Sequence, residues 1–211
     1  MPVLGKIFDV HLSYNPGQFM KYYFIILSFL MPGTGYSQTT TTVKWQVNRS
    51  VDAGDTIYYY AKRKLMWNDF RGRPETKGIA LAMTSSGFGY LLTMSSRNGK
   101  TNIKITVYCF YDKNGSWVKP GGQSDYALIH EQHHFDIAYI SACNFIKKIR
   151  AASVTVSNYD EVVQKINTES NQEMEKMQND YDGQTKNGQL KNIQAIWNKK
   201  IDEQVALVAI N

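Results

Sequence analysis

"DYALIHEQHHFDIAYISACNF" (residues 125–145) holds three of the four histidines of this 211-residue chain and marks a change in its pattern. Ser124 is a favourable N-cap, and apolar residues recur after it at helical spacing, which predicts a helix over residues 125–150. A rotation of about 100° per residue gathers seven apolar side chains on one face of this helix. They are Leu128, Phe135, Ala138, Ala142, Phe145, Ile146 and Ile149.

The same helix brings a carboxylate and two imidazoles together. Glu131 projects from the middle of the apolar face, where a buried charge without a partner is costly. His130 and His134 lie one turn apart at the edge of that face. Two such imidazoles can bind one zinc ion, and the glutamate can take a proton from water whose pKa zinc lowers to about 7. We therefore predict His130 and His134 as zinc ligands and Glu131 as the catalytic base. His133 points away from them and is expected on the surface.

The segments on either side of this helix predict the fold class. Before it the chain alternates in the manner of β-strands, and "RNGK" (residues 97–100) predicts a hairpin turn between two long strands. After it, helical periodicity returns at residues 158–181, with a capping box that starts at Ser157, and at residues 189–209. The apolar stripe of the last helix is Ile193, Trp197, Ile201, Val205 and Val208. Strands followed by helices predict an α+β fold: a mostly antiparallel sheet, the active-site helix and two further helices.

The N-terminal region predicts export. Residues 20–37 combine Lys21, a short apolar run, and small residues at positions 35 and 37, which is typical of a cleaved signal peptide. The apolar run is too short to span a bilayer comfortably, so no stable membrane span is expected after the signal is removed. Residues 1–19 are interpreted as an upstream extension from a start codon assigned too early. The remaining residues 38–211 are expected to form a single domain.

Composition narrows the function classes further. The net charge is +6, but the basic residues are scattered and form no stripe interleaved with exposed aromatic residues, so nucleic-acid binding is not expected. Cys109 and Cys143 lie in apolar surroundings. Export would allow them to form a disulfide, but buried free thiols are the favoured prediction.

Four segments carry a resemblance to a known family. They are "RKLMWNDFRGRP" (63–74), "SWV" (116–118), "HEQHHFDIA" (130–138) and "EMEKMQNDYDGQTKNG" (173–188). In this order they resemble the domain of unknown function 922 family, bacterial exported proteins regarded as candidate zinc proteases with a zincin-like core. The resemblance implies a zincin-like domain over residues 38–211, a Zn²⁺ cofactor, and a peptide or protein substrate. It also implies a place in the bacterial envelope, either periplasmic or extracellular.

One departure from that family concerns the third metal ligand. The late family motif reads Tyr-Asp-x-x-Thr-x-His-Gly, and Asn187 stands here at the histidine position. The matching residues are Tyr181, Asp182, Thr185 and Gly188. Asp182 ranks first as the third ligand because it lies inside the matching motif, and it would give two histidines and one carboxylate, a catalytic zinc set. Glu173, on the apolar stripe of its predicted helix, is the second option, and the absence of any third ligand is the last.

Two functions follow from these observations. The leading hypothesis is an exported zinc-dependent peptidase-like hydrolase, with an edge strand near residues 84–93 holding an extended substrate by strand addition. The alternative is a catalytically impaired relative that acts as a non-enzymatic envelope or binding protein, which Asn187 favours. Tyr181 is expected either to donate a hydrogen bond to an oxyanion or simply to pack.

Overall fold

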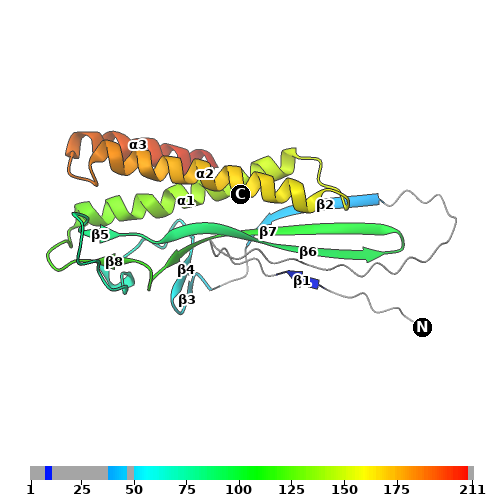
Figure 1. Cartoon of the computed structure of the whole chain (residues 1–211), viewed down its shortest axis with the longest axis horizontal. Helices are drawn as coiled ribbons and strands as arrows, with labels where there is room; N and C mark the ends of the chain where they lie inside the picture. Colours follow the sequence, from blue (N-terminus) through cyan, green and yellow to red (C-terminus); the bar gives the residue numbers. More distant parts are fainter. Residues whose placement is uncertain (1–7, 11–37, 47–49, 209–211) are drawn as a thin grey trace.

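The computed structural model describes residues 8–10, 38–46 and 50–208. An N-terminal mixed sheet is followed by three helices, which confirms the predicted α+β class. Figure 1 shows the helices stacked on one side of the sheet, with α1 against the strands and with α2 and α3 further out. The predicted signal peptide at residues 20–37 lies outside the described residues, as does most of the extension before it.

The sheet is organised around one long hairpin. Its strands are β1 (Phe8–Val10), β2 (Gln38–Trp45), β3 (Asp52–Ala53), β4 (Thr56–Tyr58), β6 (Ser86–Arg97) and β7 (Lys100–Asp112). They follow the order β1-β6-β7-β4-β3, and β2 also pairs with β7. The turn between β6 and β7 uses Asn98 and Gly99 at positive φ, as the Asn-Gly signal predicts. Because β2 runs parallel to β7 while the other pairings are antiparallel, the sheet is mixed.

A second, two-stranded sheet consists of β5 (Ala82–Met83) and β8 (Trp117–Val118), which are antiparallel. The helices are the short 3₁₀ turn η1 (Trp67–Asp69), α1 (Asp125–Ala151), α2 (Tyr159–Thr185) and α3 (Lys191–Val208). Ser124 caps α1 as predicted, because its Oγ accepts a hydrogen bond from the Ala127 N–H at 3.1 Å. The capping box predicted at Ser157 is wrong. Asn158 is the N-cap of α2, and its side chain makes no cap hydrogen bond.

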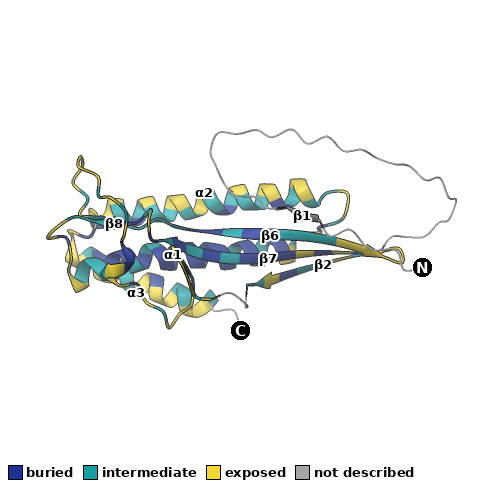
Figure 2. Ribbon diagram, turned by 90° about the horizontal axis from the view of Figure 1, so that it is seen from below, coloured by how far each residue is buried: buried dark blue, intermediate teal, exposed yellow. Residues whose placement is uncertain are grey.

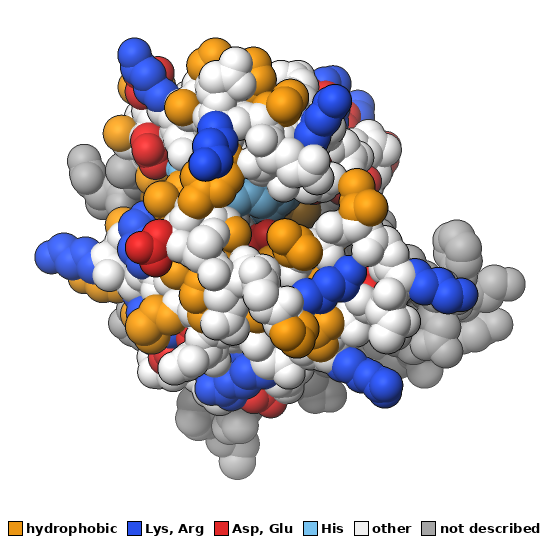
Figure 3. Space-filling view, turned by 90° about the vertical axis from the view of Figure 1, so that its left-hand side faces the viewer, with side chains coloured by type: hydrophobic (Ala, Val, Ile, Leu, Met, Phe, Trp, Pro, Cys, Tyr) orange, Lys and Arg blue, Asp and Glu red, His pale blue; other side chains and the backbone are white. Residues whose placement is uncertain are grey.

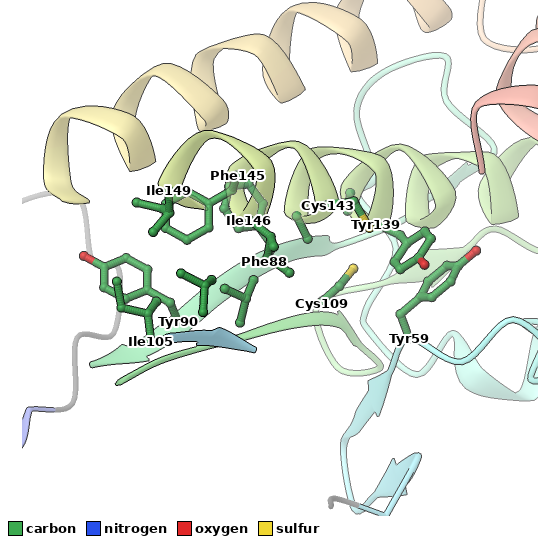
Figure 4. Close-up of a cluster of buried hydrophobic side chains, with 14 of the residues drawn as sticks. Tyr59, Phe88, Tyr90, Ile105, Cys109, Tyr139, Cys143, Phe145, Ile146 and Ile149 are labelled. Atoms are coloured by element: carbon green, nitrogen blue, oxygen red, sulfur yellow. The ribbon is translucent and has the colours of Figure 1, made fainter. Parts of the chain in front are cut away.

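The main core lies between α1 and the sheet. Alternate residues of β7 from Ile103 to Tyr111 are buried against the helix, and the apolar face predicted for α1 meets them. Figure 4 shows Phe145 of α1 against Tyr90, with ring centroids 5.4 Å apart. Cys109 and Cys143 are free and buried in this interface, as predicted. Burial raises the pKa of both thiols, that of Cys143 to about 11.

A second core cluster lies on the opposite side of α1. Ile137 and Ile140 pack there against Tyr181 of α2 and against Trp197 and Ile201 of α3. The central helix is therefore buried on two sides, and Figure 2, seen from the side of the sheet, shows α1 mostly dark blue between α2 and α3. In the part of the chain that the structure describes, no helix has the length and apolar character needed to cross a membrane.

Candidate metal centre

Three side chains from two helices converge at one end of the molecule. The Nε2 atoms of His130 and His134 are 3.2 Å apart, and the Asp182 Oδ1 of α2 lies 3.1 Å from the first and 3.0 Å from the second. We call these residues the cleft cluster. A tetrahedral zinc ion with bonds of about 2.0–2.1 Å holds its donor atoms about 3.3 Å apart. The three predicted ligands thus stand nearly at the separation that zinc requires.

Each histidine of the cleft cluster is oriented by a glutamine. His130 Nδ1–H donates to the Gln194 Oε1 at 2.8 Å, and His134 Nδ1–H donates to the Gln178 Oε1. The Gln178 amide is held in place because its Nε2 also donates to the His134 carbonyl oxygen at 3.0 Å. Since an amide oxygen only accepts, each Nδ1 carries the proton and each Nε2 is turned toward Asp182. Such outer partners fix the tautomer and the ring orientation that a metal needs.

The electrostatics of the cleft cluster favour a positive charge. Burial by itself would lower the pKa of His134, but the hydrogen bond to Asp182 and the charges of Glu131 and Asp182 outweigh it. They raise the pKa of His134 to about 9. Burial by itself would raise the pKa of the Asp182 carboxyl, yet hydrogen bonds from His130 and His134 hold that pKa well below its usual range. Without metal, a proton supplies the favoured charge; with metal, the ion replaces it.

The predicted base is buried and held by a residue that the sequence did not single out. Glu131 is only 5% exposed, and its Oε2 accepts a hydrogen bond from the Thr84 Oγ1 at 2.8 Å. Within the described residues its Oε1 has no hydrogen-bond partner. Thr84 immediately follows β5, so the small sheet sets the direction of this carboxylate. One oxygen of Glu131 is thereby anchored and the other is left available.

Two segments that are distant in the sequence, 63–74 and 116–118, pack behind Thr84 and support it. "SWV" (116–118) contains β8, which pairs with β5, and the Ser116 Oγ accepts a hydrogen bond from the Ser85 N–H at 2.8 Å. The Gly72 N–H donates to the Ser116 carbonyl at 2.7 Å, which joins the segment 63–74 to β8. A Cβ on Gly72 would lie 2.8 Å from that oxygen, so the close approach requires glycine here.

The late segment "YDGQTKNG" (181–188) surrounds His130. The Tyr181 ring is fully buried and stacks on the imidazole, with centroids 4.5 Å apart and an angle of 19°. Its hydroxyl accepts a hydrogen bond from the Gln194 Nε2, so Tyr181 packs rather than facing the cleft. Gly188, at φ 78°, passes so close that a Cβ would lie 3.4 Å from the His130 Nδ1.

The structure separates the candidates for the third ligand. Glu173, the second option, does not reach the cleft: it forms an ion pair with Lys148 at 2.8 Å, and it is exposed rather than buried as its place on the apolar stripe predicts. Asn187 lies on the wall of the cleft in the turn after α2, and its backbone N–H donates to the Asp182 carbonyl at 2.8 Å. Asp182 alone of these residues joins both histidines.

His133 is not the surface residue that the rotation predicts. It is 4% exposed because α3 packs over that side of α1. With Asp136 and Asp202 it forms a second group, which we call the flank cluster. The contact between His133 Nε2 and Asp202 Oδ1 is long, at 3.4 Å, and among the described residues the His133 Nδ1 has no hydrogen-bond partner. The Asp136 Oδ1 accepts hydrogen bonds from Tyr59 and Gln132 at 2.8 and 2.9 Å.

The cleft cluster opens into a cleft of about 870 Å³. One wall is the segment Ile79–Thr84, the other is α2 from Met174 to Asp182, and the floor is formed by Glu131 and the histidines. Figure 3 looks into this end of the molecule and shows the pale-blue histidines at the bottom of a hollow bordered by hydrophobic side chains. The volume and shape suit a bound segment rather than a lone ion.

Sequence reasoning singled out the three residues of the cleft cluster and Glu131 but missed the residues that orient them. Gln178 precedes Asp182 by one helical turn and so shares its side of α2. This spacing points to Gln178 only once Asp182 is taken as a candidate ligand. Gln194 and Thr84 offered no such signal. In comparisons with protein-family models, with curated proteins and with solved structures, the chain has no match.

Proposed function

We propose that this chain is an exported, zinc-dependent, peptidase-like hydrolase with a zincin-like core. The observation that carries the proposal is the cleft cluster: three donor atoms 3.0–3.2 Å apart, each imidazole oriented by a glutamine, beside a buried glutamate. The resemblance to the domain of unknown function 922 family supports the same assignment. Export, to the periplasm or beyond, rests on the signal-like residues 20–37.

His130, His134 and Asp182 would hold the zinc ion, which supplies Lewis acidity that polarises a carbonyl group and makes water acidic at neutral pH. Glu131 then acts as the general base: its carboxylate takes a proton from the attacking water and passes it to the leaving amine. Thr84 keeps this carboxylate in place through its 2.8 Å hydrogen bond. Gln178 and Gln194 keep the two imidazoles in the ligand tautomer.

The proposed substrate is an extended peptide added to a strand edge beside the site. The strand predicted for this role, near residues 84–93, corresponds mainly to β6, whose outer edge pairs with β1 at residues 92–94. The segment that borders the cleft is instead Ile79–Thr84, which includes β5. Within the described chain β5 pairs only with β8, so its other edge is available for strand addition.

The direct test compares zinc-loaded wild type with Glu131→Gln. Both proteins should contain equal zinc by elemental analysis, because Glu131 is not a ligand. Cleavage of a pool of extended peptides, followed by mass spectrometry, should fall by about 100-fold or more in the variant, as expected for loss of a general base. Equal cleavage by both proteins, or none by either with zinc bound, would contradict the proposal.

The second candidate function is a non-enzymatic envelope or binding protein. Asn187, at the family's histidine position, is the observation that favours it. In that case both zinc-loaded proteins would bind peptides or envelope material without cleaving them. Asn187→His should then restore Glu131-dependent cleavage, because the missing histidine would be the cause of the inactivity.

A further inference from the structure

We propose that the cleft selects an extended peptide in which a Lys or Arg side chain lies next to bulky apolar residues. This inference rests on the proposed function, since it names the substrate class of the same site. It depends on three features: the charges that line the cleft, one carboxylate that has no partner, and a row of exposed apolar side chains on the opposite wall.

The charge of the cleft is opposite to that of the chain. The protein carries a net +6, yet no Lys or Arg is among the described residues that line the cleft. Three carboxylates line it: Glu131, Glu175 and Asp182. Asp182 is hydrogen-bonded to two histidines and Glu131 to Thr84, so both have partners within the protein. A cleft lined by one sign of charge attracts ligands of the other sign, here a cation.

Glu175 is the carboxylate left for a ligand. It projects from α2 on the same face as Gln178 and Asp182, at spacings of three and seven residues, which places it further along the wall from the metal ligands. It is exposed, and within the described residues it forms neither an ion pair nor a hydrogen bond. Glu173, two residues earlier, faces another side of the helix and already pairs with Lys148. Glu175 is thus placed to meet a Lys or Arg of a bound peptide.

The opposite wall is apolar and exposed. Ile79, Leu81 and Met83 are 77%, 58% and 37% exposed, and all three line the cleft. Because all three line the same wall of the cleft, together they form one exposed apolar row. Exposed apolar rows of this kind mark binding surfaces in soluble proteins. Met174 adds an apolar side chain from the α2 wall.

A peptide that pairs with the free edge of β5 would present its own side chains alternately in two directions. One set can cover the apolar row, and the other can extend toward the α2 wall and Glu175. The expected substrate is therefore a segment in which apolar and basic residues are neighbours. A purely acidic or purely polar segment would leave the apolar row uncovered or place like charges against Glu175.

The test measures peptide binding without turnover. Zinc-loaded Glu131→Gln is titrated into four fluorescent nine-residue peptides that carry, at the two central positions, Leu-Lys, Leu-Glu, Ser-Lys or Ser-Glu, and anisotropy is recorded. Leu-Lys should bind best. Exchanging Lys for Glu should weaken binding about two- to fivefold, the range of a partly exposed ion pair, and exchanging Leu for Ser about tenfold, as for burial of an apolar side chain.

Matched variants in the Glu131→Gln background test whether Glu175 causes the preference for Lys and whether the apolar row causes the preference for Leu. Glu175→Lys should reverse the preference between Leu-Lys and Leu-Glu, while Glu173→Lys, an equal charge change outside the cleft, should leave it unaltered. Leu81→Ser should reduce the Leu-over-Ser preference, while Leu207→Ser, on α3 and 84% exposed, should not. Equal affinity for the four peptides, or a preference that survives Glu175→Lys, would overturn the inference.

The two proposals fail in different ways. If the wild type cleaves peptides in a Glu131-dependent manner but shows no preference for basic and apolar neighbours, the inference is wrong and the hydrolase stands. If Leu-Lys peptides bind with the expected preference but no peptide is cleaved, the inference stands as a binding specificity and the hydrolase is wrong.

Discussion

The cleft cluster and the flank cluster both combine histidine from α1 with a carboxylate from another helix, yet their geometries differ. In the cleft cluster the three donor atoms are 3.0–3.2 Å apart and both imidazoles have an acceptor at Nδ1. In the flank cluster the contact between His133 and Asp202 is 3.4 Å, the His133 Nδ1 has no hydrogen-bond partner within the described part of the chain, and Asp202 is largely exposed.

This difference shows that proximity of metal-binding residue types is not sufficient. The Asp136 Oδ1 accepts its two hydrogen bonds from Tyr59 and Gln132, which lie outside the flank cluster, so it has less capacity left for an ion. The Asp182 Oδ1 instead contacts the two histidines that an ion would join to it. An imidazole without an acceptor at Nδ1 is not held in one tautomer. The flank cluster is better explained as a junction between α1 and α3, with burial lowering the pKa of His133 and the charges of Asp136 and Asp202 opposing that shift.

The largest effect is expected from removing one histidine of each cluster. His134→Ala should abolish stoichiometric zinc binding, because it leaves only two protein ligands, whereas catalytic zinc sites keep three. His133→Ala should retain about one zinc per chain and cost about 1–3 kcal/mol of folding stability through loss of packing. Zinc content after dialysis and urea unfolding check both. If His133→Ala loses zinc and His134→Ala keeps it, the flank cluster rather than the cleft cluster binds the metal.

An intermediate effect is expected from the glutamines. Gln178→Leu removes the acceptor for the His134 Nδ1–H and should weaken zinc binding about 10- to 100-fold, while Gln178→Glu, which keeps an acceptor, should largely restore it. Gln132→Leu is the counterpart beside the flank cluster. It should leave zinc affinity unchanged and destabilise the fold by about 1–3 kcal/mol, since the Leu65 N–H loses its 2.8 Å partner. A competition titration with a chelator of known affinity measures the zinc effect.

The smallest effect is expected at the two exposed acids. Glu173→Gln removes the surface ion pair with Lys148, and Asp202→Asn changes only the long 3.4 Å contact with His133. Each should change stability by no more than about 0.5 kcal/mol. Neither should alter zinc affinity, whereas Asp182→Asn should weaken it strongly. If Glu173→Gln releases zinc and Asp182→Asn does not, the assignment of the third ligand is wrong. Thermal unfolding with and without zinc distinguishes these outcomes.

Much of the fold followed from local patterns. The extent of α1, its apolar face, the Asn-Gly hairpin and the apolar stripe of α3 were predicted nearly as observed, because each depends on a short-range period or turn preference. The rotation argument failed at His133 because it treats a helix as having one buried face. The sheet covers one face of α1, and α2 and α3 cover another.

The sequence by itself determined that His130, Glu131 and His134 lie close together on one side of a helix, since residues four apart are separated by one turn of any α-helix. Only the tertiary structure decided between Asp182 and Glu173, because both lie on α2 and the choice depends on which face of that helix meets α1. It alone also supplied Gln194, Gln178 and Thr84. Partners that come from other segments have no periodic signature, so long-range packing has to bring them to the site.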